Sequence, residues 1–371
     1  MYFYLRRNVF HPRSFFATLL FLNAVLCVGL RGVAGHGLDY LRRNIGIDRH
    51  RALLLGRNRY ADLVNSIIEV LHPHGIHVAD RLALEADKPF ADLLAAIKRS
   101  AREKGLDCLL VAEPALSVAQ IMRLLEVGDE LDIPVKVLSA KLDVLVTRAH
   151  MPADLIHGVP LVHFCAPSTA TRFAALRHAA GRVFAAVLLV VLLPVLGVIA
   201  LLIKLTSKGP VFFVQERIGV DRKPFRMIKF RTMYDRASEL QAQVEEFNES
   251  GDGLFKIRRD PRVTPVGRLL RRFSLDELPQ LVNVLKGKMT LVGPRPLPRR
   301  DFENYYEQWH YSRHEGMPGL TCLWQISGRS DLDFHSMCIL DVYYLRNQSW
   351  MLDLTIIIKT IWVVVFAKGA Y

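Results

Sequence analysis

Cysteines are few in this sequence of 371 residues, and low-complexity tracts are absent. The five cysteines form neither a CxxC pair nor the Cys/His spacing of a zinc site, so the sequence predicts no disulfide framework and no structural zinc. The lack of biased tracts, together with 51% hydrophobic residues, excludes a collagen-like, mucin-like or wholly disordered chain. The length suits roughly two folded domains.

Acidic residues are also fewer than basic residues. The chain has 36 Asp and Glu residues against 49 Lys and Arg residues, which leaves a net charge of +13. Such a surplus favours contact with polyanions, namely nucleic acid, the cytoplasmic face of a membrane, or phosphorylated substrates. The charge alone leaves all three classes open.

Long uncharged runs occur at two places. Ser14–Leu30 would span about 25 Å as a helix and predicts an N-terminal membrane helix, with a cleaved signal peptide as the alternative. Val183–Ile203 is long enough to cross a bilayer, but Pro194 near its middle predicts a kink. Basic residues flank this second run on both sides, which favours a re-entrant helix that returns to the same face of the membrane.

Short apolar runs alternate with helical periodicity between residues 46 and 150. This βαβα order predicts a parallel sheet covered by helices, with strands at Ala52–Leu55, Ile76–Ala79, Cys108–Ala112 and Val135–Leu138. The first strand is followed by one glycine, Gly56, where a dinucleotide-binding fingerprint has three. We therefore expect a Rossmann-like regulatory or packing domain, with a nucleotide-dependent oxidoreductase built on residues 51–140 as the alternative.

Arginine and lysine crowd the stretch from Arg217 to Arg300, between glycines and prolines. Guanidinium groups bind phosphate oxygens in a bidentate way, and the prolines beside Arg295 reduce the loop entropy that binding would cost. The pattern indicates phosphate binding, with a solvated basic face or a nucleic-acid patch as alternatives. The nearby membrane segment favours the phosphate interpretation, and we expect no nucleic-acid partner.

Two carboxylates stand side by side at Asp276 and Glu277, after several arginines. Ser274 and Glu277 have the spacing of a capping box, which would give the two carboxylates only the structural role of starting a helix. In that register Pro279 would interrupt the helix, whereas Asp276 as N-cap would put the proline in the first turn. Both registers place the carboxylates at a positive helix terminus that also favours phosphate or Mg²⁺, so structural and catalytic interpretations stay open.

Ten short motifs follow one another in the second half of the chain. They are Gly209–Phe213, Gln215–Gly219, Lys229–Met233, Thr264–Gly267, Ser274–Leu278, Leu285–Gly287, Leu291–Pro296, Pro318–Thr321, Trp324–Arg329 and Asp341–Tyr344. In this order they resemble the bacterial sugar transferase family, the monotopic polyprenyl-phosphate phosphoglycosyl transferases. The first half resembles, more weakly, the larger members, which carry membrane helices and a Rossmann-like domain before the catalytic part.

The resemblance implies a reaction in which undecaprenyl phosphate receives a hexose 1-phosphate from a UDP-sugar, with release of UMP and a need for Mg²⁺. It implies UDP-glucose or UDP-galactose as the donor, and a role in starting exopolysaccharide or O-antigen synthesis. Asp276 would be the nucleophile of a covalent phospho-sugar intermediate and a metal ligand, with Glu277 as its catalytic partner. The implied substrate-binding residues are Arg217, Lys229, Arg231, Arg271, Arg295, Gln325 and Arg329.

The predicted architecture is α/β, in four parts. They are an N-terminal membrane helix and linker (1–45), a Rossmann-like parallel-sheet domain (46–150), a linker (151–176) and a mainly helical α+β catalytic domain (177–371) that begins with the re-entrant helix 183–203. A last apolar segment, Trp350–Phe366, contains two charged residues and predicts an interfacial or core helix. The resemblance implies the bacterial inner membrane, with the catalytic domain on the cytoplasmic face in contact with membrane lipids.

Three positions depart from the family pattern. Gly181 and Leu193 stand where the family usually has an acidic residue and often has a serine before the kink proline, so we expect different interfacial anchoring. Met317 replaces a common Arg or Lys, which argues against phosphate binding at that position. A homodimer and a non-catalytic role in polysaccharide assembly are left open.

Overall fold

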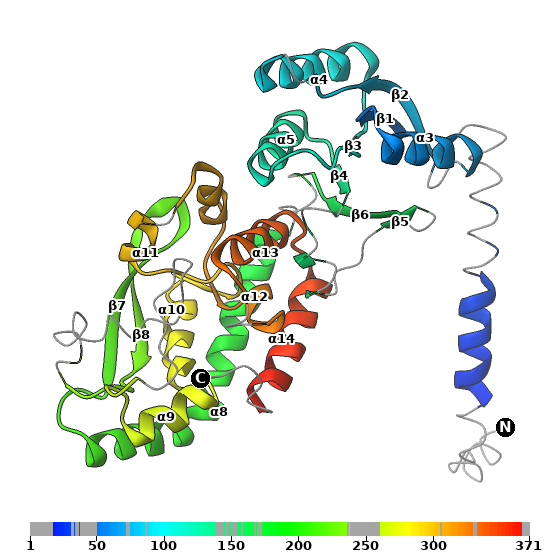
Figure 1. Cartoon of the computed structure of the whole chain (residues 1–371). Helices are drawn as coiled ribbons and strands as arrows, with labels where there is room; N and C mark the ends of the chain where they lie inside the picture. The colour runs from blue at the N-terminus through cyan, green and yellow to red at the C-terminus, as the bar shows by residue number, and fades with distance from the viewer. Residues whose placement is uncertain are drawn as a thin grey trace, which may run out of the picture.

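The computed structural model describes residues 18–30, 33, 37, 50–71, 75–85, 88–138, 142, 144–145, 148–149, 154–156, 159–166, 168, 173–235, 237, 260–304, 306–328 and 332–365. Figure 1 shows two units: a sheet with its helices, coloured blue to teal, and a second unit coloured green to red. The acidic pair predicted from the sequence lies in the second unit.

A six-stranded sheet forms the first unit, in the order β2-β1-β3-β4-β6-β5. Its parallel strands are β1 (His50–Leu55), β2 (Ile76–Leu82), β3 (Cys108–Val111) and β4 (Val135–Leu138), which confirms the predicted parallel sheet. β5 (Asp154–Ile156) and β6 (Val159–Phe164) add two antiparallel strands. They lie within 151–176, where the sequence predicted a linker. The sequence did not indicate them because β5 has only three residues and Pro160 weakens the strand pattern of β6.

Alternation along the strands sends their side chains into two cores. The covering helices are α3 (Arg59–Leu71), α4 (Phe90–Lys104) and α5 (Val118–Leu131). Ala52 and Leu54 pack on the side of α3, whereas Leu53 and Leu55 belong to the core that contains residues of α4 and α5. The sheet is therefore covered on both faces, as a Rossmann-like domain requires.

The second unit is mainly helical, as predicted. In chain order its elements, with η for 3-10 helices, are α8 (Ala174–Thr206), β7 (Phe212–Ile218), η3 (Val220–Arg222), β8 (Pro224–Phe230), α9 (Pro265–Arg272), η5 (Leu275–Gln280), α10 (Leu281–Leu285), β9 (Thr290–Val292), α11 (Arg299–Asn304), η6 (Gln308–His314), β10 (Gly319–Thr321), α12 (Leu323–Ile326), α13 (Phe334–Arg346) and α14 (Trp350–Val365). β7 and β8 form an antiparallel hairpin, and β9 pairs with β10 in parallel.

The two units share an apolar core. Phe164 at the end of β6 meets Tyr343 of α13 edge to face, with ring centroids 5.7 Å apart. Arg346 at the end of α13 forms an ion pair with Asp129 of α5. The Rossmann-like unit is thus packed directly on the helices that follow the acidic pair in sequence.

The helix α8 is the one helix in the described ranges that is long and apolar enough to cross a membrane, and only 11% of its most apolar window is buried. Pro194 lies inside it. Figure 1 shows α8 as two arms, one running through the second unit and one along its lower edge. The arms have different neighbours, since Ala185 packs with residues of α10, whereas Ile199 packs with residues of α9. A bend at the proline explains this change of partner.

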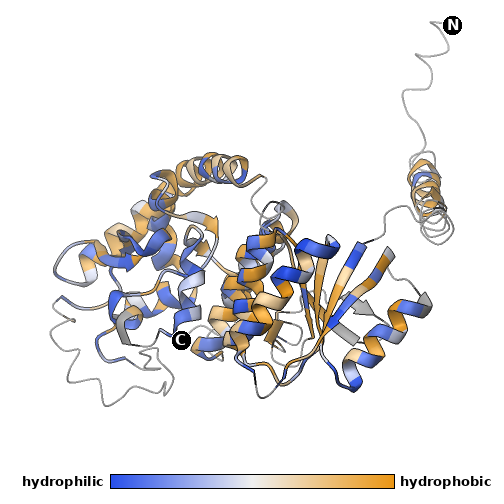
Figure 2. Ribbon diagram, turned by 90° about the horizontal axis from the view of Figure 1, so that it is seen from above, coloured by the Kyte–Doolittle hydropathy of each residue, from blue (hydrophilic) through white to orange (hydrophobic). Residues whose placement is uncertain are grey.

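Two shorter apolar helices carry exposed apolar side chains. Thr18–Leu30 is apolar along nearly its whole length (Figure 2) and every side chain is exposed, while the beginning of the predicted helix Ser14–Leu30 lies outside the described residues. α14 buries Ile356 and exposes apolar residues that include Trp350 and Trp362. This one-sided burial agrees with an interfacial helix at the C-terminal end.

Candidate active site

The acidic pair lies on η5, which directly follows α9. Ser274, just before η5, has a left-handed backbone (φ 51°) and its side chain makes no capping bond. Neither capping register proposed from the sequence is present, and the i to i+3 bonding of a 3-10 helix accommodates Pro279. Both carboxylates are therefore available for contacts beyond their own helix.

Two cations hold the Glu277 carboxylate. Its Oε1 accepts Lys229 Nζ at 2.8 Å and Arg295 Nη2 at 3.0 Å, and its side chain is only 13% exposed. Burial alone would raise the pKa of Glu277, but Lys229 and Arg295 outweigh burial and hold this pKa well below its usual range. Glu277 is therefore ionised at neutral pH and anchors both basic side chains.

Asp276 is also buried, but its surroundings differ. Within the described ranges no hydrogen bond acts on its carboxylate, and burial raises its pKa, with Glu277 adding to the effect against the attraction of Lys229. The two adjacent carboxylates thus have pKa values shifted in opposite directions. Such a separation is typical of pairs in which one group reacts and the other supports it.

Lys229 reaches Glu277 from strand β8. Asn283 of α10 fixes this strand, because its Oδ1 accepts the Ile228 amide at 3.1 Å and its Nδ2 donates to the Arg226 carbonyl at 2.7 Å. The buried Asn283 side chain takes the place of a strand partner at this edge of the hairpin. The register of the hairpin against η5 is thereby set, and with it the position of Lys229.

Arg295 comes from the loop after β9, where two backbone segments pass very close to each other. A Cβ on Gly293 would lie 2.4 Å from the Met317 carbonyl oxygen, so a larger residue does not fit. The Arg295 guanidinium lies over the Trp324 ring, 5.4 Å from its centroid, in a cation–π contact. The Arg295 carbonyl oxygen accepts Arg313 Nη2 at 2.7 Å, so both backbone and side chain are fixed.

The ion pair between Arg313 and Asp341 is a part of the site that the sequence analysis missed. Both side chains are 1% exposed, and Arg313 Nη1 also donates to Tyr306 Oη at 3.0 Å. The pair supports the loop that carries Arg295, and loss of either partner would leave a buried charge uncompensated. The available signal was an aspartate within α13, a helix whose neighbouring residues are apolar.

Two other predicted phosphate ligands stand beside the acidic pair. Arg217 Nη1 donates to the Pro296 carbonyl at 3.2 Å, and burial, together with the charge of Arg295, lowers the pKa of Arg217 to about 10. Arg271 Nε donates to Thr232 Oγ1 at 3.0 Å, and its charge acts on the first carboxylate of the pair. The structure thus brings basic side chains from four separate segments to one place.

The remaining predicted ligands have other placements. Arg231 turns towards the end of α8, where its Nη2 donates to the Ser207 hydroxyl at 2.7 Å and to the Ser207 carbonyl at 2.9 Å. Gln325 caps α12, since its Oε1 accepts the Cys322 amide at 3.0 Å. Neither residue contacts the acidic pair in these placements, and the expected role of both in substrate binding stays a prediction. Arg329 lies outside the described residues.

Magnesium is the metal implied by the resemblance, and the donor set suits it because Mg²⁺ prefers carboxylate oxygens. Lys229 and Arg295 both use Oε1 of Glu277, which leaves Oε2 for another contact. The Asp276 carboxylate carries no hydrogen bond from the described residues. Asp276 and Glu277 are therefore the residues that would hold the ion, together with substrate phosphate oxygens.

A second group of metal-type ligands, Glu307, His310 and His335, has ligand atoms within 4.8 Å of one another. His310 Nδ1 already accepts the Glu307 amide at 2.8 Å, so Nε2 carries the proton of this neutral ring and donates to His335 Nδ1 at 3.1 Å. Burial lowers the pKa of His310 to about 3, which keeps the ring neutral. These residues form a hydrogen-bonded cap on η6 and do not suit a metal ion.

Comparison with known proteins points to the same region. The 39% identical exopolysaccharide production protein ExoY of Rhizobium meliloti (strain 1021) matches over 191 residues, which are 50% of this chain and 84% of that protein. The undecaprenyl-phosphate glucose phosphotransferase of Komagataeibacter xylinus is 36% identical over 291 residues, 73% of this chain and 51% of that protein. The undecaprenyl-phosphate galactose phosphotransferase of Salmonella typhimurium is 41% identical over 167 residues, 44% of this chain and 35% of that protein.

The match to a known family is equally direct. The profile of the family described as bacterial sugar transferase covers residues 172–367, from the start of α8 to the end of α14. This stretch contains the acidic pair, the basic residues around it and the supporting ion pair, and it makes up more than half of the chain. The protein therefore belongs to the bacterial sugar transferase family.

Proposed function

We propose that the protein transfers a hexose 1-phosphate from UDP-glucose or UDP-galactose to undecaprenyl phosphate, and so starts exopolysaccharide or O-antigen synthesis. The observation that carries the proposal is the acidic pair, in which Glu277 is held by two cations and Asp276 is buried without a hydrogen bond from the described residues. The names of two relatives support the acceptor and the hexose class, one for glucose and one for galactose.

The first step is attack by an Asp276 carboxylate oxygen on the β-phosphorus of the donor. A new bond forms between this oxygen and phosphorus, and the bond from phosphorus to the bridging oxygen breaks, so UMP leaves with that oxygen. In the second step an oxygen of undecaprenyl phosphate attacks the same phosphorus and the bond to Asp276 breaks. Asp276 is regenerated, and the lipid carries a diphosphate-linked sugar.

The surrounding residues have separate tasks in this reaction. Asp276 must be ionised to attack, and Lys229 favours that state by lowering a pKa that burial raises. Arg217, Arg271 and Arg295 balance the charge of the donor phosphates, and fixed guanidinium groups do so without reorganising during the reaction. Bound Mg²⁺ would supply further charge neutralisation at the phosphate oxygens.

The membrane arrangement follows from α8 and its exposed apolar surface. We infer that α8 enters the bilayer and returns to the same face, because Pro194 interrupts the helix and its two arms pack on different elements. Both ends of α8 then lie on the cytoplasmic face of the bacterial inner membrane, where a nucleotide sugar and the lipid phosphate group meet. Membrane lipids would contact α8, α14 and the helix Thr18–Leu30.

A nucleotide-dependent oxidoreductase is the less favoured alternative. The amide groups at the start of α3, where a dinucleotide phosphate would bind, are taken by the Asn58 side chain, whose Oδ1 accepts Tyr60 and Ala61 at 2.9 and 3.0 Å. Asn58 Nδ2 also donates to Glu113 at 2.9 Å, which places an acidic group beside it. The Rossmann-like unit therefore supports a packing or regulatory role. A non-catalytic assembly role would not explain the buried acidic pair and the basic residues around it.

The direct test is turnover by the purified full-length protein in lipid nanodiscs. Undecaprenyl phosphate and a panel of nucleotide sugars are supplied, and the released nucleoside monophosphate is measured. Release of UMP with UDP-glucose or UDP-galactose, dependent on both acceptor and Mg²⁺, is the expected result. Retention of NAD(P) by the protein together with no nucleotide release would favour the oxidoreductase alternative.

A further inference from the structure

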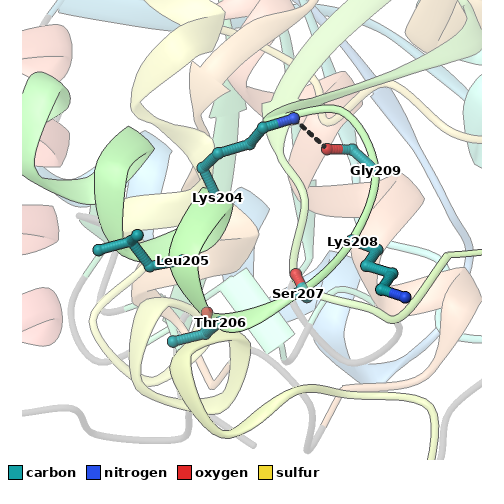
Figure 3. Close-up of a pocket in the computed structure, with 6 residues that line it drawn as sticks. All are labelled: Lys204, Leu205, Thr206, Ser207, Lys208 and Gly209. Atoms are coloured by element: carbon teal, nitrogen blue, oxygen red, sulfur yellow. Dashed lines mark hydrogen bonds between the residues drawn. The ribbon is translucent and has the colours of Figure 1, made fainter.

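A hollow of about 400 Å³ lies where α8 ends and the chain turns towards β7. It is lined by Lys204, Leu205, Thr206, Ser207, Lys208 and Gly209 (Figure 3). Lys204 Nζ contacts the Gly209 carbonyl at 3.5 Å across the turn. The hollow therefore combines two lysines with a turn of exposed backbone at the end of the membrane-associated helix.

Arg231 brings a third positive charge to this turn. Arg231 is 7% exposed, and two of its nitrogens, Nε and Nη1, have no hydrogen-bond partner among the residues that the structure describes. Nη1 lies only 2.0 Å from where a Cβ of Gly209 would stand, so this unpartnered nitrogen borders a residue that lines the hollow. Gly209 also has a φ of +113°, which L side chains rarely adopt, so the close approach depends on glycine.

Capping of α8 explains only part of this arrangement. Basic residues are favourable at the C-terminal end of a helix, and Arg231 Nη2 does bind Ser207 there. Capping uses one nitrogen of the guanidinium and leaves two buried donors without a partner among the described residues. Buried donors are nearly always paired, so these two leave positive charge uncompensated beside the hollow.

We propose that this hollow binds a phosphate group carried by a lipid. In the described ranges, three positive charges outnumber the acidic group beside the turn, Asp235, whose carboxyl carbon would lie 3.3 Å from the same Gly209 Cβ. Exposed apolar side chains adjoin the hollow along the chain, among them Leu205, Phe212 and Phe213, and would contact the lipid tail.

The hollow is also linked to the acidic pair. Ile203, in the last turn of α8, belongs to the apolar cluster that contains Leu275, the residue just before Asp276. A lipid phosphate held at the end of α8 would therefore lie on the side of the catalytic unit where the acceptor must approach. This inference rests on the proposed function when the lipid is the acceptor undecaprenyl phosphate, and is independent of it when the lipid is an ordinary phospholipid.

The test measures lipid binding and turnover separately in the full-length protein. Nanodiscs of phosphatidylcholine hold wild-type protein, the double variant Lys204→Gln/Lys208→Gln, or the control Lys223→Gln, which removes one charge from the exposed turn between β7 and β8. Binding of a fluorescent polyprenyl phosphate is titrated. Competitors are unlabelled polyprenyl phosphate, phosphatidylglycerol and polyprenol, which lacks the phosphate.

The expected result is a loss of affinity of about tenfold or more in the double variant, since each charge-assisted contact contributes roughly a factor of ten, and an affinity in the control that equals wild type. If polyprenyl phosphate is the one competitor of the three that displaces the probe, the hollow binds the acceptor. If phosphatidylglycerol displaces the probe as well as polyprenyl phosphate does, the hollow binds phospholipid headgroups. Equal competition by polyprenol, or unchanged affinity in the double variant, would overturn the proposal.

Turnover distinguishes this inference from the proposed function. Wild-type protein that binds polyprenyl phosphate but releases no nucleoside monophosphate with any donor would refute the proposed reaction and leave the lipid site standing. Wild-type protein that turns over, while the double variant binds lipid as well as wild type does, would refute only the lipid site.

Discussion

Replacement of each carboxylate of the acidic pair by its amide should have different effects on stability: Glu277→Gln should destabilise the protein, and Asp276→Asn should not. Glu277→Gln removes a negative charge that Lys229 and Arg295 both contact, at 2.8 and 3.0 Å, in a site where Glu277 is 13% exposed. Asp276→Asn removes a negative charge whose burial is unfavourable, as its raised pKa shows. The two changes are chemically identical and lie on adjacent residues, so each serves as a control for the other.

The size of the effect follows from the contacts. Loss of one partner from a buried ion pair costs about 3–5 kcal/mol, and the glutamine oxygen still accepts one of the two donors, so we expect about 3 kcal/mol for Glu277→Gln. For a unit of this size this lowers Tm by about 6–12 °C, at about 2–4 °C per kcal/mol. Asp276→Asn should leave Tm unchanged or raise it. Both variants should lose turnover by orders of magnitude.

The pH dependence gives an independent check with a defined sign. The pKa of Glu277 is lowered in the folded protein, so its stabilising contribution is present above its unfolded pKa and is lost as pH falls through the folded value. The pKa of Asp276 is raised, so its destabilising contribution disappears as pH falls below that raised value. The Tm difference between wild type and Asp276→Asn should therefore shrink in mild acid.

The assay is thermal unfolding of the full-length protein in nanodiscs, followed by tryptophan fluorescence at neutral and mildly acidic pH. Turnover is measured on the same preparations, so that unfolding and loss of chemistry are separated. A Glu277→Gln variant as stable as wild type would refute the ion-pair account. So would an Asp276→Asn variant that loses as much stability as Glu277→Gln.

Three further outcomes follow from the same geometry. In Lys229→Met, the pKa of Asp276 should rise further, so the acid limb of the profile of turnover against pH should move to higher pH. An unmoved acid limb would contradict the claim that Lys229 keeps the nucleophile Asp276 ionised. Arg295→Lys keeps the charge but loses the planar fork, so its turnover should fall nearly as far as that of Arg295→Ala, whereas a near-normal rate would show that charge alone suffices. Single cysteines at Leu176 and Lys208, in a Cys-free background, should both resist an impermeant thiol reagent in intact cells and react after lysis; labelling of one alone in intact cells would establish a spanning α8.

Much of the first unit could be predicted from the sequence because its strands are continuous apolar runs of ordinary length. Cys108–Val111 and Val135–Leu138 are buried almost throughout, which is the pattern of a parallel strand covered on both faces. β5 escaped prediction because it is an edge strand of only three residues, and β6 because Pro160 interrupts its strand pattern. Pairing of such strands depends on the sheet beside them.

The acidic pair could be located from the sequence, but the partners of its members could not. Lys229 and Arg295 are 48 and 18 positions away from Glu277, and their convergence depends on Asn283 and on the close backbone approach at Gly293. The capping box suggested by the spacing of Ser274 and Glu277 did not form, because η5 is a 3-10 helix after a left-handed residue. Local spacing cannot distinguish a cap from a side chain that is held by distant cations.

The roles expected for Arg231 and Gln325 show the same difficulty. Both lie in motifs that resemble the family, and both make contacts away from the acidic pair, with Ser207 and with Cys322 respectively. The buried Asp341 lies in another such motif, and its partner Arg313 lies outside all of them. A motif identifies residues that matter together, while their individual tasks depend on tertiary contacts.

The central claim is that Asp276 forms the covalent bond to the transferred phosphoryl group. The most direct test mixes the full-length protein with UDP-glucose or UDP-galactose and Mg²⁺ in the absence of acceptor lipid, and measures the intact mass and the modified peptide by mass spectrometry. The account predicts a mass increase of one hexose phosphate on the peptide that contains Asp276, its disappearance when undecaprenyl phosphate is added, and no adduct in Asp276→Asn. An adduct on another residue, or acceptor-dependent UMP release by Asp276→Asn at a rate close to wild type, would contradict it.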